Sequence, residues 1–371
     1  MDLFFELIEV ALGTRDRLSR CPTEEEWGEL YELSQKQSIA SFVFPALEIL
    51  IRHGQKPPME TLYEWIGFSE QVKGQNELMN KEAARLTALF ENEGHRTAIL
   101  KGQANARLYP NPQSRQPGDI DIWVSGGKKS VLQTLKKMHL MDKGLSKYGS
   151  KKAKESYHHI HLPTNENGID VEVHFRPSSG NYNLFANRRL QKFLDKEIEG
   201  DNQLVEGGFR MPSLKFALVM QMAHIQRHFL GAGLGLRQII DYYYLLRSDT
   251  GHECEDVKGR LRELGLSHIA GAVMWILHKE LGLEEEYLIA PVDEERGKLL
   301  LAVVQEGGNF GYYNTDMPNG SFKRLILRRL KRLKRIKFDV QEVFFREIHL
   351  VLFFFSSIPE RIRRRSWSIE E

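Results

Sequence analysis

The fold prediction is decided by the stretch Gly118-Asp119-Ile120-Asp121-Ile122. Its two carboxylates are separated by one apolar residue, and successive side chains of a β-strand point to opposite faces. The stretch therefore predicts a strand that carries Asp119 and Asp121 on one face. A buried face gains nothing from unpaired charge. This pair therefore needs a counter-charge, and a divalent metal ion is the commonest strong one.

Further short β-strands are predicted on both sides of this stretch. Upstream, Thr97–Leu100 is an apolar run that ends at Lys101-Gly102. Downstream, Tyr157–Leu162 and Ile169–Phe175 predict two more strands, and the Asn167-Gly168 step between them is a strong hairpin signal. We therefore expect a small mixed sheet that includes the Asp-x-Asp strand.

Helical periodicity dominates outside this unit. Apolar residues recur at helical spacing before about residue 70 and again beyond about residue 200. We therefore expect an α+β fold that is mainly helical, with a small mixed β-sheet core between N- and C-terminal helical domains. The predicted boundaries are a helical region at 1–70, the α/β core at 71–200 and a helical region at 201–371.

The composition restricts the class of protein. The chain has 371 residues and a net charge of +2, so its overall charge indicates no polyanionic partner. Two cysteines exclude a disulfide framework and a cysteine-rich zinc module, and they suit a reducing compartment. Acidic residues stand early, where a signal peptide carries positive charge, and no apolar run reaches the roughly 18–20 residues of a membrane span. We expect a cytoplasmic protein.

A third carboxylate is expected beside the first two. On the strand at 169–175, Asp170, Glu172 and His174 share one face. If this strand neighbours the Asp-x-Asp strand, three carboxylates converge, which suits two hard cations that also bind phosphate oxygens. Two such ions clamp the attacking and leaving oxygens of an in-line phosphoryl displacement. Lys101 and Arg115 are placed to supply the positive charge that this chemistry needs.

Four motifs carry a resemblance to a known family, in chain order Leu100-Lys101-Gly102, Arg115, Asp119-Ile120-Asp121 and Glu172-Val173-His174-Phe175. Their order and the predicted elements between them resemble the DNA polymerase β-like nucleotidyltransferase superfamily. Within it, the chain is most similar to an uncharacterised bacterial nucleotidyltransferase family, although Phe175 stands where that family often has Trp. Gln103 also departs from the pattern, because Ser usually follows the glycine turn and contacts phosphate.

The resemblance implies a Mg²⁺-dependent nucleotidyltransferase. Such an enzyme moves a nucleoside monophosphate from an NTP, with ATP as the default, to an unidentified acceptor and releases pyrophosphate. The acceptor can be a small molecule, a protein or a nucleic acid. The implied ligands of two Mg²⁺ ions are Asp119, Asp121 and Glu172. The motif match favours Glu172 over Asp170, which strand facing alone does not separate.

By the same resemblance, Gly102 lets the backbone approach the triphosphate. The expected nucleotide-binding residues are Lys101, Gly102, Gln103, Arg115 and Arg237.

The histidines leave two interpretations open. His159 and His161 share a strand face with the partner-strand His174, and together with the adjacent His158 they suggest a zinc site. This alternative function is a histidine-based zinc hydrolase. In the other interpretation the same imidazoles orient Glu172 or contact the substrate.

A later segment also matches the resembled family, which has a histidine-rich helix followed by Arg and Asp. His224 and His228 lie one helical turn apart and are either half-buried helix residues or substrate contacts. Arg237 and Asp241 are four residues apart and form either an intrahelical ion pair or a group in which Arg237 reaches the phosphates or the base.

The segment Lys323–Lys337 is a basic amphipathic stretch with a rough helical stripe of leucines. Such a helix can lie on an anionic membrane, bind nucleic acid, or pack its stripe within its own fold. The membrane interpretation predicts peripheral attachment at the inner membrane face. It also supports an alternative function, a catalytically silent nucleotide-binding or membrane-associated module on the same fold.

Overall fold

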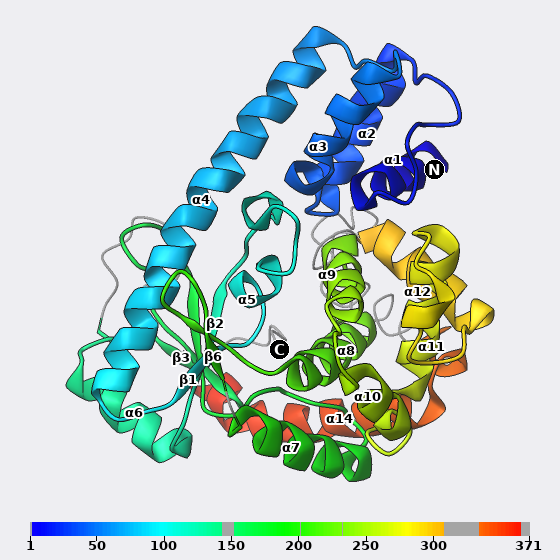
Figure 1. The fold of residues 1–371 in the computed structure, drawn as a ribbon. Helices are drawn as coiled ribbons and strands as arrows, with labels where there is room; N and C mark the ends of the chain where they lie inside the picture. The colour runs from blue at the N-terminus through cyan, green and yellow to red at the C-terminus, as the bar shows by residue number, and fades with distance from the viewer. Residues whose placement is uncertain (1, 143–151, 201, 232, 308–333, 365–371) are drawn as a thin grey trace.

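The computed structural model describes residues 2–142, 152–200, 202–231, 233–307 and 334–364 (Figure 1). Helices make up most of this part of the chain, and they surround a five-stranded mixed β-sheet. The predicted fold class, α+β and mainly helical, is therefore confirmed.

The N-terminal part consists of α1 (Asp2–Leu12), α2 (Glu24–Lys36), α3 (Ala40–Arg52) and α4 (Met59–Asn92). Helix α2 begins with a capping box, in which Thr23 and Glu26 each accept a hydrogen bond from the other's backbone amide. Helix α4 packs against α2 and α3 with its first half and against the sheet with its second half (Figure 1).

Helix α4 is continuous across residue 70. Gly67 and Gly74 lie inside α4 without interrupting it, because glycine weakens a helix by only about 1 kcal/mol per residue. The predicted boundary between residues 70 and 71 falls within this helix. The division into three domains stays a prediction.

The sheet has the strand order β1-β2-β5-β4-β3. The strands are β1 (Thr97–Ile99), β2 (Ile120–Val124), β3 (Lys154–Glu155), β4 (His159–His161) and β5 (Val171–His174). Strands β2 and β5 are parallel neighbours, and the other adjacent pairs are antiparallel. The predicted hairpin between β4 and β5 is therefore confirmed. In the register, Asp121 lies opposite Glu172, and Glu172 lies opposite His161.

The apolar face of the sheet packs against two helices. Its central side chains, Ile122 and Val173, are fully buried and share a core cluster with Met79 of α4 and Val131 of α6 (Gly127–Lys137). The intervening residues of the same strands point the other way. The second face consequently carries the polar side chains.

The remaining helices follow the sheet in sequence and form the other half of the molecule (Figure 1). They are α7 (Leu184–Ile198), α8 (Leu214–Leu230), α9 (Leu236–Arg247), α10 (Glu253–Arg260), α11 (Ser267–Trp275), α12 (Glu294–Gly307) and α14 (Val340–Arg364). Short elements connect these parts, namely α5 (Gln103–Ala106), η1 (Pro112–Ser114), β6 (Gln203–Leu204), β7 (Arg210–Met211), η2 (Ile276–Glu280), η3 (Glu285–Tyr287) and η5 (Lys334–Lys337). One large apolar core joins α1–α3 to α8, α9, α11 and α12.

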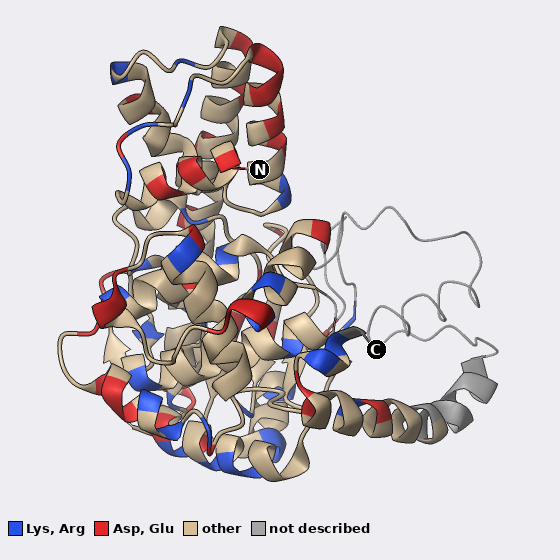
Figure 2. Cartoon of the chain, turned by 90° about the vertical axis from the view of Figure 1, so that its right-hand side faces the viewer, with Lys and Arg blue, Asp and Glu red and all other residues tan. Residues whose placement is uncertain are grey.

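Most of the predicted basic amphipathic segment, residues 323–333, lies outside the described residues, and its last four residues form η5. Helix α14 follows and extends from the body of the molecule (Figure 2). Within the described ranges, no helix is both long enough and apolar enough to cross a membrane.

Candidate active site

The Lys101-Gly102 turn brings a positive charge to the polar face of the sheet. Gly102 has φ 59° and ψ −106°, a conformation that L-residues with side chains rarely adopt. A Cβ atom there would lie 3.5 Å from the carbonyl oxygen of Asp119. The turn directs Lys101 back across the sheet, so that its Nζ lies 3.2 Å from Oδ2 of Asp121.

Asp121 is the most buried of the three predicted metal ligands, with 2% of its surface exposed. Its Oδ1 is 2.9 Å from Nε2 of His174, and its Oδ2 contacts Lys101. Burial alone would lower the pKa of His174, but its hydrogen bonds with Asp121 and Glu172 raise that pKa to about 9. Burial likewise opposes the charge of Lys101, yet Asp121 and the other carboxylates hold the pKa of Lys101 above its ordinary value. Asp121 therefore lies between Lys101 and His174, one on each carboxylate oxygen.

Glu172 stands beside Asp121 because β2 and β5 are parallel and in register. Its Oε2 lies 3.3 Å from Nδ1 of His159 and 3.5 Å from Nε2 of His174. Burial would raise the pKa of Glu172, but the hydrogen bond with His174 keeps it below its ordinary value. Asp170, the alternative third carboxylate, accepts a hydrogen bond from the hydroxyl of Thr164. The register therefore brings Glu172 next to Asp121.

The donor atoms of Asp121, Glu172 and His174 lie within 4.8 Å of one another. Oδ2 of Asp121 is buried, and no described residue gives it a hydrogen bond of good geometry. Asp119 precedes β2 by one residue and is half-buried. Its charge raises the pKa of Glu172. Hard carboxylate oxygens at the spacing of Asp121 and Glu172 fit a divalent cation such as Mg²⁺, and Asp119 is in neither group of converging ligand atoms.

A second group of possible metal ligands consists of His158, His159 and His174, whose donor atoms also lie within 4.8 Å. The expected convergence of His159, His161 and His174 is corrected here, because His158 takes the place of His161. The carbonyl of His158 accepts hydrogen bonds from the amides of both Phe175 and Arg176. In a regular strand, the side chains of the consecutive residues His158 and His159 would point to opposite faces. This irregularity of the strand pairing explains how both join one cluster.

Helix α8 places the predicted pair His224 and His228 over this polar face. Their rings are 4.2 Å apart. Burial, followed by the positive charge of Lys101, lowers the pKa of His228 to about 4 and that of His224 well below its ordinary value. Both imidazoles are therefore neutral and lie within electrostatic reach of Lys101.

The model of the family described as uncharacterised nucleotidyltransferase matches residues 23–282. This chain belongs to that family. The matched range contains the whole sheet, α8 and α9. Membership supports a nucleotidyltransferase-like function with an NTP substrate.

Other comparisons add little. The crystal structure of an antigenic nucleotidyltransferase-like protein from Paracoccidioides brasiliensis matches 58% of this chain and 94% of that chain, with 13% identity and a TM-score of 0.30. This similarity is too remote to support an argument about the site. No curated protein matches the chain.

Arg115 forms a buried ion pair with Asp241 of α9. Its Nε and Nη2 donate to the two carboxylate oxygens of Asp241 on α9, at 2.7 and 2.8 Å. The hydroxyl of Tyr109 donates to the same carboxylate at 2.8 Å. Arg115 is 5% exposed, and its expected contact with the triphosphate stays a prediction.

Arg237 does not form the intrahelical ion pair that was one alternative, because Asp241 pairs with Arg115. Instead, Nη1 of Arg237 donates to the carbonyls of Gln116 and Pro117, at 2.9 and 3.1 Å. Burial, followed by repulsion from Arg115, lowers the pKa of Arg237 to about 10. The two arginines therefore hold the loop that leads into the Asp-x-Asp strand.

Gln103 also binds protein groups. Its Nε2 donates to Oδ1 of Asn80 and of Asn76 on α4, at 2.9 and 3.2 Å. Asn76 in turn donates to the carbonyls of Gln113 and Arg115. Sequence reasoning missed this contribution of α4. Two asparagines four residues apart beside the apolar stripe of a helix were the signal that could have revealed it.

Proposed function

We propose that this protein is a Mg²⁺-dependent nucleotidyltransferase that transfers a nucleoside monophosphate from an NTP, with ATP as the default donor, to an acceptor and releases pyrophosphate. One observation carries the proposal. The carboxylates of Asp121 and Glu172 lie side by side on parallel strands, next to a glycine turn that delivers Lys101. We further propose that it acts in the cytoplasm.

Asp119, Asp121 and Glu172 would hold two Mg²⁺ ions. Bound there, the ions supply charge neutralisation for the triphosphate and for the attacking and leaving oxygens. The side chain of Lys101 retains 16% exposure and provides positive charge beside the phosphates. Gly102 has no Cβ, so the main chain can approach a phosphate closely.

The protein groups around Glu172 support a role in proton transfer. His159 and His174 contact its carboxylate and hold its orientation. The carboxylate of Glu172 can accept the proton of an acceptor hydroxyl. Arg115, Arg237 and Asp241 act as positioning residues, since they hold the loop before β2 against α9. His224 and His228 lie over the same face and are candidates for substrate contact.

A second candidate function is favoured by a specific feature of α14. An exposed apolar stripe runs along this helix and includes Val340, Phe344, Ile348, Leu352 and Phe355. Large exposed apolar patches mark interaction surfaces, and the stretch 323–337 that precedes the helix is rich in Lys and Arg. A nucleotide-binding module that attaches peripherally to an anionic membrane would use this stripe.

The test is turnover with α-labelled NTPs, Mg²⁺ and fractionated cell extract as the source of acceptor. We expect labelled acceptor and pyrophosphate from the wild type and none from Asp121→Asn. Lys137→Ala, on the outer surface of α6, is the matched control and retains turnover.

Three other outcomes discriminate the alternatives. Metal-dependent NTP binding without turnover, together with sedimentation on anionic vesicles, favours the membrane-associated module. Stoichiometric zinc in the purified protein favours the zinc hydrolase. Absence of Mg²⁺-dependent NTP binding contradicts the proposal.

A further inference from the structure

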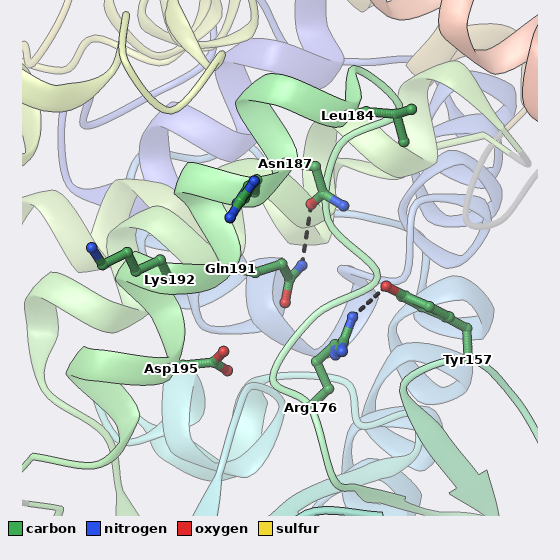
Figure 3. A pocket seen from close by; sticks show the side chains of 8 residues that line it. Tyr157, Arg176, Leu184, Asn187, Gln191, Lys192 and Asp195 are labelled. Carbon is green, nitrogen blue, oxygen red and sulfur yellow. Dashed lines mark hydrogen bonds between the residues drawn. The ribbon is translucent and has the colours of Figure 1, made fainter.

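A cavity of about 470 Å³ lies between α7 and the strand ends that carry Tyr157 and Arg176 (Figure 3). None of its lining residues was predicted as part of the site. Figure 3 shows Arg176 and Tyr157 on one side, with Asn187, Gln191 and Asp195 of α7 opposite them.

The backbone that follows β5 connects the cavity wall to the carboxylate site. Arg176 follows His174 by two residues, and its carbonyl oxygen lies 3.4 Å from Nδ1 of His174. The other nitrogen of the same imidazole, Nε2, is 2.9 Å from Asp121. Tyr157 immediately precedes His158 of the histidine cluster. One imidazole ring therefore separates the backbone of the cavity wall from the candidate metal ligands.

The charge of the lining favours an anion. Three cations line the cavity, Arg176, Arg188 and Lys192, against one carboxylate, Asp195. The guanidinium of Arg176 lies 4.8 Å from the ring centre of Tyr157 and donates to its hydroxyl, which holds the arginine at the edge of the cavity. Arginine and lysine side chains in such an arrangement suit a phosphate or a carboxylate.

Gln191 provides an independent sign of a ligand. The residue is 9% exposed, and its Nε2 donates to the carbonyl of Ser178 and to Oδ1 of Asn187, at 3.1 and 3.2 Å. Its Oε1 is buried, and no group in the described part of the chain donates to it. Buried acceptors are nearly always satisfied. A ligand hydroxyl or amine in the cavity would satisfy this one.

We propose that this cavity binds the acceptor, and that the acceptor is a small molecule with an anionic group and at least one hydroxyl. Arg176, Arg188 and Lys192 bind the anionic group, and Gln191 accepts a hydrogen bond from a hydroxyl. The inference rests on the proposed function. In the transfer, an acceptor hydroxyl oxygen forms a bond to the α-phosphorus of the NTP. The bond from that phosphorus to pyrophosphate breaks, and the hydroxyl proton passes to Glu172.

The experiment measures binding of glycerol 3-phosphate to the full chain by calorimetry. Propyl phosphate, which has the same phosphate monoester and no hydroxyl, is the comparison ligand. We expect glycerol 3-phosphate to bind about tenfold more tightly than propyl phosphate, the size of one hydrogen bond to a buried acceptor. Gln191→Met should remove that difference. Arg188→Ala with Lys192→Ala should weaken both ligands by about tenfold or more.

Lys196→Ala is the matched control, because Lys196 lies one turn beyond Lys192 on α7, is exposed and does not line the cavity. It should bind both ligands as the wild type does. The inference is overturned if neither ligand binds the wild type, if Lys196→Ala weakens binding as much as the double variant Arg188→Ala with Lys192→Ala, or if folded Gln191→Met still distinguishes the two ligands.

A second measurement separates this inference from the proposed function. Asp119→Asn with Asp121→Asn should lose Mg²⁺–ATP binding and keep glycerol 3-phosphate binding. Wild-type binding of Mg²⁺–ATP without binding of glycerol 3-phosphate overturns the cavity assignment alone. Binding of glycerol 3-phosphate without any binding of Mg²⁺–ATP overturns the proposed function and, with it, the acceptor role of the cavity.

Discussion

The two faces of the sheet are built from alternate residues of the same strands, and they differ in chemistry. On one face, Ile122 and Val173 are fully buried in the cluster they share with α4 and α6. On the other, Asp121 and His174 are almost as deeply buried, with 2% and 3% of their surfaces exposed. Equal burial thus accompanies apolar packing on one side and paired charges on the other.

This difference indicates where the fold is stabilised and where the function lies. Burying apolar side chains contributes directly to stability. Burying charges costs several kcal/mol per ion unless each is paired. The Lys101–Asp121–His174 group is paired in this way. Changes on the apolar face should therefore reduce stability and spare the chemistry, whereas changes on the polar face should remove the chemistry and cost stability only where they leave a buried charge unpaired.

The largest effect is expected on the polar face. Asp119→Asn with Asp121→Asn should lower turnover by about a thousandfold or more, since metal-assisted charge stabilisation of several kcal/mol is lost. Labelled transfer assays measure this, and circular dichroism shows whether the variant folds. The single variant Asp119→Asn, at the half-buried position, provides a second test. If a folded double variant kept more than a tenth of the wild-type turnover, the assignment of the chemistry to the polar face would be wrong.

The buried ion pair beside the polar face should have the next largest effect. Asp241→Asn leaves Arg115 buried without its partner charge, which should lower the free energy of unfolding by about 3–5 kcal/mol at pH 7. Chemical denaturation of wild type and variant measures the difference.

The same pair predicts a pH dependence. Burial would raise the pKa of Asp241, but Arg115 holds it below its ordinary value of 3.8. The pair therefore contributes stability above that value and loses it as the pH falls through the lower pKa of the folded state. The difference between wild type and Asp241→Asn should shrink in acid. A difference that stays constant from pH 7 down to the acid transition would contradict this account of the pair.

On the apolar face, Ile122→Ala should lower the free energy of unfolding by about 3 kcal/mol, because it removes fully buried methyl groups and leaves a cavity. The affinity of the folded protein for Mg²⁺–NTP should stay unchanged. Ile51→Ala on α3 is the control, since Ile51 is 37% exposed, and it should cost less than about 1 kcal/mol. If Ile122→Ala abolished nucleotide binding in the folded protein, the two faces would not be separable.

The smallest effect is expected for an ion pair outside the apolar layer. Nζ of Lys137 on α6 lies 2.6 Å from Oε2 of Glu93, and the lysine side chain is 69% exposed. Lys137→Ala should change the free energy of unfolding by less than about 1 kcal/mol. A double-mutant cycle with Glu93→Ala measures the pair itself. A coupling as large as that of Arg115 with Asp241 would show that burial does not control these energies.

Much of the sheet could be predicted because strand signals are local. The alternation in Asp119-Ile120-Asp121 predicts the strand, and Asn167-Gly168 predicts the hairpin that pairs β4 with β5. The register between β2 and β5 depends on packing between segments about fifty residues apart. From the sequence we could therefore state only that the carboxylates converge if these two strands are neighbours. The roles assigned to the carboxylates stay predictions.

The partners of Arg115, His158 and Gln103 could not be predicted, because no local sequence pattern records these contacts. Arg115 finds its partner, Asp241, 126 positions along the chain. His158 joins the histidine cluster through a strand irregularity that the amides of Phe175 and Arg176 create. Gln103 is held by asparagines of a helix that precedes the sheet. In each case, tertiary packing determined which of several plausible partners a polar side chain met.

The most direct test of the central claim is the anomalous scattering of Mn²⁺ in crystals that also contain a non-hydrolysable NTP. The account predicts metal peaks at bonding distance from carboxylate oxygens of Asp119, Asp121 and Glu172, with the triphosphate against Lys101 and Gly102. Nucleotide bound elsewhere, or no metal peak while Asp121 keeps its contacts with Lys101 and His174, would contradict it.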